Sequence, residues 1–337
     1  MQSKPISDID FVVEINNMRE RINKYSIAQW EGWDSDVDAM DIIKANRTVM
    51  QGSNDSFEEI AAWVDDHGVK TQEDIDYVAR SVDIENYLDY VAVQIYVGNP
   101  DLLNVKRYRS VEEDGKWRWV LFDTDWGYTT DTNSMRRWLD PRGAGSEYKT
   151  DNRLFVGLMA NDSIRDQFLH RFDELMLKSW TADKVLATID KYARILEPEI
   201  DQHLERWGFT RAKYDREMKI FREYAEERPL KMLYYIKDTY EMNESTMMSY
   251  FSDSLPVVVK QAIDDIVAKI DASGRSKWLK DVRLDEDEYS KKLEKLYEYA
   301  EEHPALLLKP IYEVYKSNGD AGAHDLKAFK DVLDQAK

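Results

Sequence analysis

The sequence predicts an α+β fold in which one β-hairpin lies among many helices. Residues 56–98 carry apolar side chains at helical spacing, and residues 105–123 read as two strands joined by an Asp-Gly turn. Almost every segment after Leu154 again has helical periodicity. With 337 residues, 43% of them hydrophobic, the chain is long enough for one large domain or two ordinary ones.

Charge and composition argue against several classes of function. The chain has 66 acidic and 47 basic residues, and the net charge of -19 repels the phosphates of nucleic acids and anionic lipid surfaces. It has no cysteine, which removes disulfides, thiolate nucleophiles and Cys-ligated zinc. No stretch approaches the roughly 18 apolar residues of a membrane span. We therefore expect no nucleic-acid partner and no membrane span.

The first expected element is a strand within residues 9–22, where a β-branched and aromatic run leads into a polar end. One strand needs partners, and the residues before it are too few to supply them. We therefore expect that the chain begins inside a sheet whose earlier part is missing, as after an N-terminal truncation.

Three helices follow this segment. A capping box of Ser56 and Glu59 starts the first, which ends at Gly68, and the second begins at Thr71. The third follows the N-cap residue Asp83 and reads IENYLDYVAVQIYV, which is apolar on nearly every face. This third helix should be buried.

Two polar loops flank the predicted hairpin. The loop NPDLLN carries Asp101 and Asn104 ahead of the strand VKRYRS, and the strand KWRWVLFD runs into DTDWG, which carries Asp123 and Asp125. A hairpin returns the chain to its start, so the two loops should be neighbours. Three carboxylates and one carboxamide oxygen form a hard-oxygen site suited to Mg²⁺ or Mn²⁺, completed by phosphate oxygens. The alternative is two ordinary polar turns.

Other polar and aromatic residues give weaker signals. Residues 129–152 are rich in Thr, Asp, Asn, Gly and Arg and read as a functional loop. The five histidines form no metal-binding pair, and no GxSxG or GxxxxGK[ST] motif occurs. Four tryptophans are better explained as core residues than as a sugar-binding platform: Trp117, Trp119, Trp126 and Trp138.

A repeat lies in the helical half of the chain. Residues 214–240 align with residues 289–315 at an offset of 75 positions, with ten of 27 residues identical. Both copies contain EYAEE followed one residue later by proline, at Pro229 and Pro304. Each copy should form a helix, a break at the proline and a second apolar helix, and the two copies should pack together.

These motifs, in this order, resemble the CotH family of spore-coat and secreted bacterial protein kinases. The residues that carry the resemblance are VDIENYLDYVAVQIYVGNPDLLNVKRYRS and GKWRWVLFDTDWGY, and it extends over roughly residues 10–240. It implies an atypical protein-kinase-like fold with a mostly helical large lobe, a β-hairpin catalytic centre and a truncated N-terminal small lobe. It also implies transfer of the ATP γ-phosphoryl group to Ser or Thr of partner proteins with Mg²⁺ or Mn²⁺. A spore-coat or extracellular location follows from the resemblance alone.

The resemblance also assigns roles to residues. Asp101 is similar to the catalytic-loop Asp that takes the acceptor proton, and Asn104 to the Asn that holds metal. Asp123 and Asp125 match the motif that holds the metal-triphosphate. Lys106 beside this loop is a candidate to offset phosphate charge, although a strand-surface lysine is its favoured role.

Glu20 is a candidate to orient a basic residue on the phosphates, although a structural salt bridge is its favoured role. By this reading, residues 1–50 are a remnant of the small lobe and hinge, residues 51–250 the catalytic large lobe, and residues 251–337 an appended helical repeat unit. The acidic surface favours a basic, Ser/Thr-rich protein substrate.

Two departures from the family pattern support a rival function. The Asp101-to-Asn104 spacing is about two residues shorter than in the family, and the loop lacks the family's Trp. The small-lobe segment with its G-E-Y-W-G-like strand is absent before Asp8. The rival is a catalytically inactive member that binds a partner through its helical half. A weaker third reading is a carbohydrate-associated adhesin.

Overall fold

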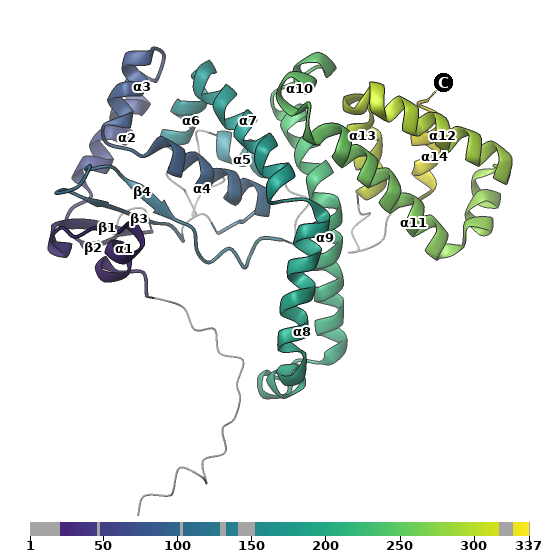
Figure 1. The fold of residues 1–337 in the computed structure, drawn as a ribbon, viewed down its shortest axis with the longest axis horizontal. Helices are drawn as coiled ribbons and strands as arrows, with labels where there is room; N and C mark the ends of the chain where they lie inside the picture. Colours follow the sequence, from purple (N-terminus) through teal and green to yellow (C-terminus); the bar gives the residue numbers. More distant parts are fainter. Residues whose placement is uncertain are drawn as a thin grey trace, which may run out of the picture.

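The computed structural model describes residues 21–45, 48–101, 104–128, 133–140, 152–316 and 326–336. Figure 1 shows a small sheet at one end of the molecule and a large helical body beside it. The strands are β1 (Met40–Lys44), β2 (Thr48–Gln51), β3 (Lys106–Ser110) and β4 (Arg118–Val120). The first helical elements are α1 (Lys24–Glu31), η2 (Val37–Ala39), α2 (Asp55–His67), α3 (Gln72–Ala79) and α4 (Ile84–Val97).

The remaining helices build the body. They are α5 (Ser134–Leu139), α6 (Arg153–Met159), α7 (Asp162–Lys178), α8 (Ala182–Trp207), α9 (Arg211–Thr239), α10 (Glu244–Phe251), α11 (Ser254–Val282), α12 (Glu286–Glu302), α13 (Pro304–Tyr315), η3 (Leu326–Ala328) and α14 (Phe329–Leu333). The mostly helical chain with a small antiparallel sheet confirms the predicted α+β class. Within the described residues no helix is long and apolar enough to cross a membrane.

The sheet is antiparallel throughout, in the order β2-β1-β3-β4. One face carries Met40, Ile42 and Tyr108, which form a small core with α1. The other face carries Ile43 and Trp119, which belong to the main core. Because successive strand residues point to opposite faces, this sheet joins the α1 layer to the helical body.

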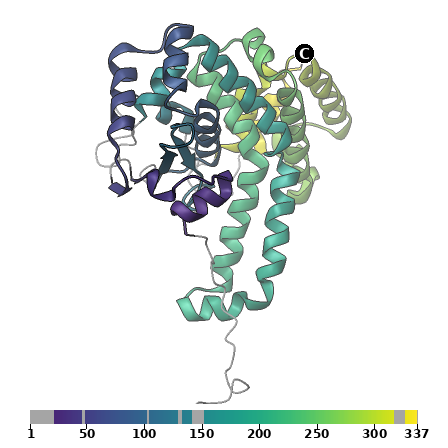
Figure 2. The same cartoon turned by 60° about the vertical axis from the view of Figure 1, so that its left-hand side comes forward.

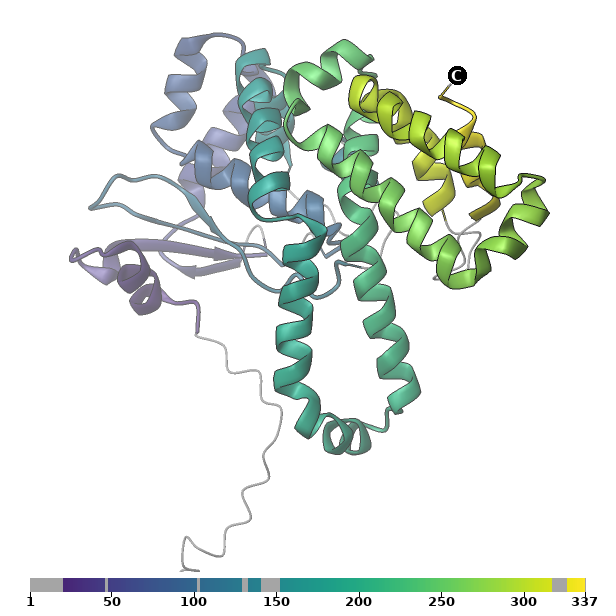
Figure 3. The same ribbon diagram turned by 45° about the vertical axis from the view of Figure 1, so that its right-hand side comes forward.

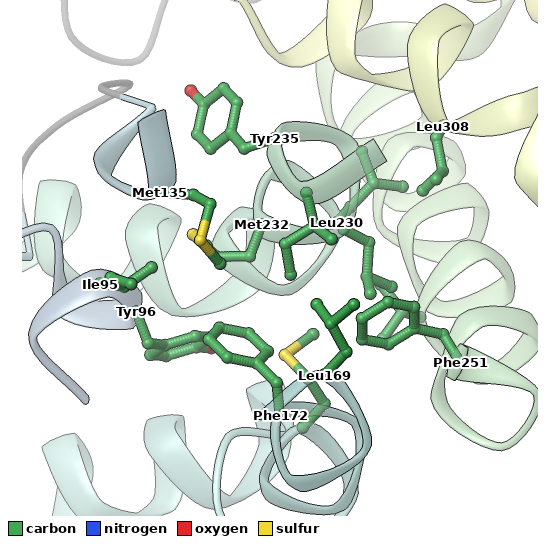
Figure 4. Close-up of a cluster of buried hydrophobic side chains, with 14 of the residues drawn as sticks. Ile95, Tyr96, Met135, Leu169, Phe172, Leu230, Met232, Tyr235, Phe251 and Leu308 are labelled. Atoms are coloured by element: carbon green, nitrogen blue, oxygen red, sulfur yellow. The ribbon is translucent and has the colours of Figure 1, made fainter. Parts of the chain in front are cut away.

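Helix α4 lies at the centre of the body. Nine of its 14 residues are buried, as its apolar sequence predicts. Figure 4 shows Ile95 and Tyr96 of α4 in one cluster with Phe172 of α7 and Met232 of α9. The main core continues from Ile43 through to Ala336, so residues from all three predicted units contribute to it. The predicted domain limits stay a prediction.

Helix α8 and the first half of α9 form a two-helix arm that projects from the body. The arm is visible in Figures 1, 2 and 3, with the short connection between the two helices at its tip. Four large apolar side chains on it are exposed: Tyr192, Ile195, Trp207 and Phe209.

Several predicted elements are confirmed and others need correction. The N-cap of α4 is Asp83 and its C-cap is Gly98, and Thr71 caps α3. The capping box at Ser56 is wrong: α2 begins at Asp55 with Asn54 as its N-cap, and the Ser56 hydroxyl accepts a hydrogen bond from Trp117 Nε1 at 3.1 Å. Helix α5 lies inside the loop predicted at residues 129–152.

The repeat is confirmed as a packing unit but not in its detail. Tyr234 of α9 stacks on Tyr312 of α13 at 4.2 Å between ring centroids, so the two copies pack together. The second copy breaks between α12 and α13 at Pro304, whereas α9 runs unbroken through Pro229. The residue before Pro229 is Arg228, which is buried and bonded to α4, whereas His303 before Pro304 is only partly buried and contacts Glu244.

The four tryptophans predicted to be core residues differ in burial. Trp117, Trp119 and Trp138 are buried, as expected for core residues. Trp126, in the DTDWG loop, is 66% exposed. Core packing is therefore confirmed for three of the four.

Candidate functional site

The candidate site begins at the C-terminal end of α4. Gly98 adopts the left-handed conformation, with φ of 66°, and ends the helix. Asn99 is only 2% exposed, and its side-chain amide donates to Gln94 Oε1 at 3.0 Å. Its own Oδ1 accepts the backbone N–H of Asp101 at 3.0 Å. A buried asparagine therefore fixes the loop that presents Asp101.

The Asp101 carboxylate is half-buried and lies within electrostatic range of Tyr90. Burial raises the pKa of the Tyr90 phenol well above its usual range, and the Asp101 charge raises it further. Tyr90 is also hydrogen-bonded to Gln94, the residue that holds Asn99. The loop is thus supported by a neutral tyrosine and two amide side chains.

The second loop lies beside the first. The Asn104 side-chain amide donates to Asp123 Oδ2, which confirms that the hairpin brings the two loops together. Asp123 has a φ of 56°, a left-handed backbone that is uncommon outside glycine. The chain turns sharply here, directly after the hairpin.

The DTDWG loop is bound directly to α4. The Gly127 N–H donates to Thr124 O at 2.9 Å, and the Tyr128 N–H donates to Val97 O at 2.8 Å. A Cβ at position 127 would lie 2.6 Å from Val97 O, so only glycine allows this approach. Asp125 and its neighbour Trp126 are both exposed.

The predicted metal ligands are only partly gathered. Asn104 and Asp123 are in contact, but among the residues that the structure describes no group of three or more His, Cys, Asp or Glu could hold a metal ion. The donors present are nevertheless hard oxygens. Mg²⁺ commonly takes one or two carboxylates and completes its shell with water and phosphate oxygens, so the set fits such an ion bound together with a nucleotide.

Positive charge gathers at the same end of the sheet. Lys106 is directly opposite Lys44 in the pairing of β1 with β3, so both side chains lie on the same face of the sheet. Burial lowers the pKa of Lys106, and the charges of Lys44 and Arg21 lower it further, whereas Asp123 opposes this shift. The Lys106 ammonium lies 5.0 Å from the centre of the Phe122 ring.

Sequence reasoning missed two of these cations. Lys44 comes opposite Lys106 only through long-range strand pairing, and the charge of Arg21, which lies before α1, also acts on Lys106. No local pattern indicated either. The strand β1 itself, MDIIK, was the available signal, because it is a short apolar run of strand-forming residues. Glu20 and most of the strand predicted at residues 9–22 lie outside the described residues.

Comparison with known proteins identifies a family for this chain. The family model described as CotH kinase protein matches residues 12–232, which is more than half of the chain and includes both loops and both paired lysines. No curated protein and no solved structure matches the chain.

Proposed function

Because the chain belongs to the CotH kinase protein family, we propose that it is a phosphotransferase that moves the ATP γ-phosphoryl group to Ser or Thr of a partner protein. One observation carries the proposal. The loop with Asp101 and the loop with Asp123 are neighbours, and both are fixed to the last turn of α4. Phosphoryl transfer requires mainly positioning and charge neutralisation, which such an arrangement supplies.

In this proposal Asp101 accepts the proton of the acceptor hydroxyl. The hydroxyl oxygen bonds to the γ-phosphorus while the bond from that phosphorus to the β–γ bridging oxygen breaks, which leaves ADP and a phosphoester. Asp123, Asn104 and Asp125 would hold Mg²⁺ or Mn²⁺, and the ion neutralises charge on the phosphates when bound. Rotation of the Asn104 amide would turn its oxygen toward the ion.

The paired lysines would hold the phosphates. Two like charges directly opposite each other on neighbouring strands destabilise a sheet, and an anion between them removes that cost. Lys44 and Lys106 are directly opposite each other on β1 and β3, and the charge of Asp123 acts on Lys106. We assign to them the neutralisation of the triphosphate, assisted by Arg21.

The proposed substrate rests on net charge, and the proposed location rests on the family name. A net charge of -19 attracts basic proteins, so we propose a basic, Ser/Thr-rich substrate. A spore-coat or extracellular location agrees with the family name.

A second candidate function is an inactive, partner-binding member of the family. It is favoured by one observation: the described residues include no group of three acidic or histidine side chains that could hold a metal ion. In this case the helical half of the chain would be the functional surface.

Isothermal titration with MnATP tests the proposed metal and nucleotide site. We expect the wild type to bind and both Asp123→Ala and Asp125→Ala to bind at least about tenfold more weakly, because the ion loses a ligand. Asp65→Ala removes an exposed carboxylate on α2 and should bind like the wild type. No binding by the wild type, or equal binding by all four proteins, would contradict the proposed site.

A further inference from the structure

The last turn of α4 is held by side chains from other helices. Arg228 of α9 is 1% exposed, and it donates from Nε to Tyr96 O at 2.6 Å and from Nη2 to Ile95 O at 2.8 Å. The Tyr224 hydroxyl donates to Tyr96 O at 2.6 Å, and Ser134 Oγ donates to Ile95 O at 2.5 Å. These carbonyls form the negative end of the helix, where a buried cation is stabilising.

The loop that carries Asp101 follows directly after these carbonyls. Its amides are bonded back to α4: the N–H of Gly98 donates to Ile95 O, and that of Asn99 to Gln94 O. A shift of the last helical turn would therefore move the loop and the Asp101 carboxylate with it. Arg228 fixes that turn from outside, so it also fixes the loop.

The neighbouring residue on α9 is bonded in another direction. Glu227 is 3% exposed, and its carboxylate accepts from Lys231 at 3.0 Å and from Lys269 of α11 at 3.3 Å. Lys269 also contacts Asp265 at 2.6 Å, and the Tyr315 hydroxyl of α13 donates to Asp265 at 2.9 Å. Removing one member of a buried charged group is costly, because the remaining charges lose their compensation.

Two neighbouring residues of α9 thus join two parts of the chain. Arg228 is bonded to α4, whereas Glu227 is bonded to α11 through Lys269. Helices α11 and α13 both lie beyond residue 232, where the match to the family ends. The helices after the family region therefore support the α9 segment that supports the Asp101 loop.

We propose that Arg228 is a positioning residue for the Asp101 loop, and that α11 holds Arg228 in place through the contact between Lys269 and Glu227. The C-terminal helical unit is then part of the site's support. The catalytic consequence rests on the proposed function, whereas the structural coupling does not.

Hydrogen exchange of the loop amides tests the coupling without any activity. In Lys269→Met, the amides of Gly98, Asn99 and Asp101 should exchange about tenfold faster than in the wild type, because local opening becomes easier. Lys269→Arg keeps the charge and should restore slow exchange. Lys260→Met removes an exposed lysine from the same helix and should leave exchange unchanged.

A second variant acts on the other end of the coupling. Arg228→Lys keeps a charge but replaces the planar guanidinium by a single ammonium, which cannot reproduce the separate bonds from Nε and Nη2. The same amides should therefore exchange faster while amides of α12 keep their wild-type rates. Unchanged loop exchange in both Lys269→Met and Arg228→Lys would overturn the proposal, as would equal acceleration throughout the protein.

Kinetics separate this inference from the proposed function. If the wild type transfers phosphate, Lys269→Met should lower kcat several-fold with little change in the KM for ATP, because it displaces Asp101 rather than the phosphate-binding lysines. If the wild type transfers none but the loop exchange changes as expected, the proposed reaction is wrong and the coupling stands.

Discussion

Substitution of Gly127 by alanine tests how the DTDWG loop is attached to α4. The added Cβ would lie 2.6 Å from Val97 O and 3.0 Å from Thr124 O, and both are backbone atoms that cannot rotate away. The two hydrogen bonds to these oxygens, at 2.8 and 2.9 Å, must therefore lengthen or break. With each bond contributing about 0.5–1.5 kcal/mol net, the free energy of unfolding should fall by about 1–3 kcal/mol.

The same substitution should also weaken MnATP binding, because Asp123 and Asp125 lie on the displaced loop. Gly115→Ala is the matched control: Gly115 has a φ of 69° at the hairpin turn, and no atom lies within 4 Å of its added Cβ. It should cost about 1–2 kcal/mol through backbone strain and leave binding unchanged. Urea unfolding and isothermal titration measure both quantities. A Gly127→Ala protein with wild-type stability and wild-type affinity would refute the attachment described here.

Three further predictions concern charge and packing. Lys44→Met and Lys106→Met should each weaken MnATP binding in titrations, by roughly tenfold at low salt and by less at high salt. Lys70→Met, which removes an exposed lysine, should bind MnATP like the wild type. Equal affinities of all these proteins would show that Lys44 and Lys106 do not bind the phosphates. Burial raises the pKa of Glu226, so its ionised form destabilises the fold. Glu226→Gln should therefore unfold at a higher temperature than the wild type at about pH 8. This difference in unfolding temperature should vanish below pH 4.5, where the wild-type carboxyl is protonated in both the folded and the unfolded state. A higher unfolding temperature of the variant at every pH would contradict this reasoning. Deleting residues 255–337 should expose the apolar face of α9 and cause aggregation in size-exclusion chromatography, and a monomeric, equally stable product would show that the repeat copies fold independently.

Local signals in the sequence predicted the elements closest to the site. The start and end of α4 follow from Asp83 and Gly98, whose side-chain cap and left-handed backbone depend on neighbouring residues alone. The contact between Asn104 and Asp123 follows from the geometry of a hairpin, which also requires no distant partner.

The features that sequence reasoning missed depend on distant residues. Lys44 and Lys106 become neighbours only when β1 pairs with β3. Ser56 has the sequence of a helix cap, but Trp117 uses its hydroxyl instead. Arg228 precedes a proline and reads as a helix break, yet α9 continues through Pro229, and Arg228 is bonded to α4. Each of these features involves a contact between residues distant in the sequence, which local patterns do not indicate.

Phosphate transfer from radiolabelled ATP to a basic, Ser-rich peptide is the most direct test of the central claim. The assay should contain Mn²⁺ and compare the wild type with Asp101→Asn, which keeps the shape of the loop but removes the proton acceptor. We predict transfer by the wild type and a loss of about 10²–10⁴-fold in Asp101→Asn, with nearly unchanged MnATP binding. Equal transfer by both proteins would contradict the role of Asp101, and a wild type that binds MnATP but transfers no phosphate would contradict the phosphotransferase itself.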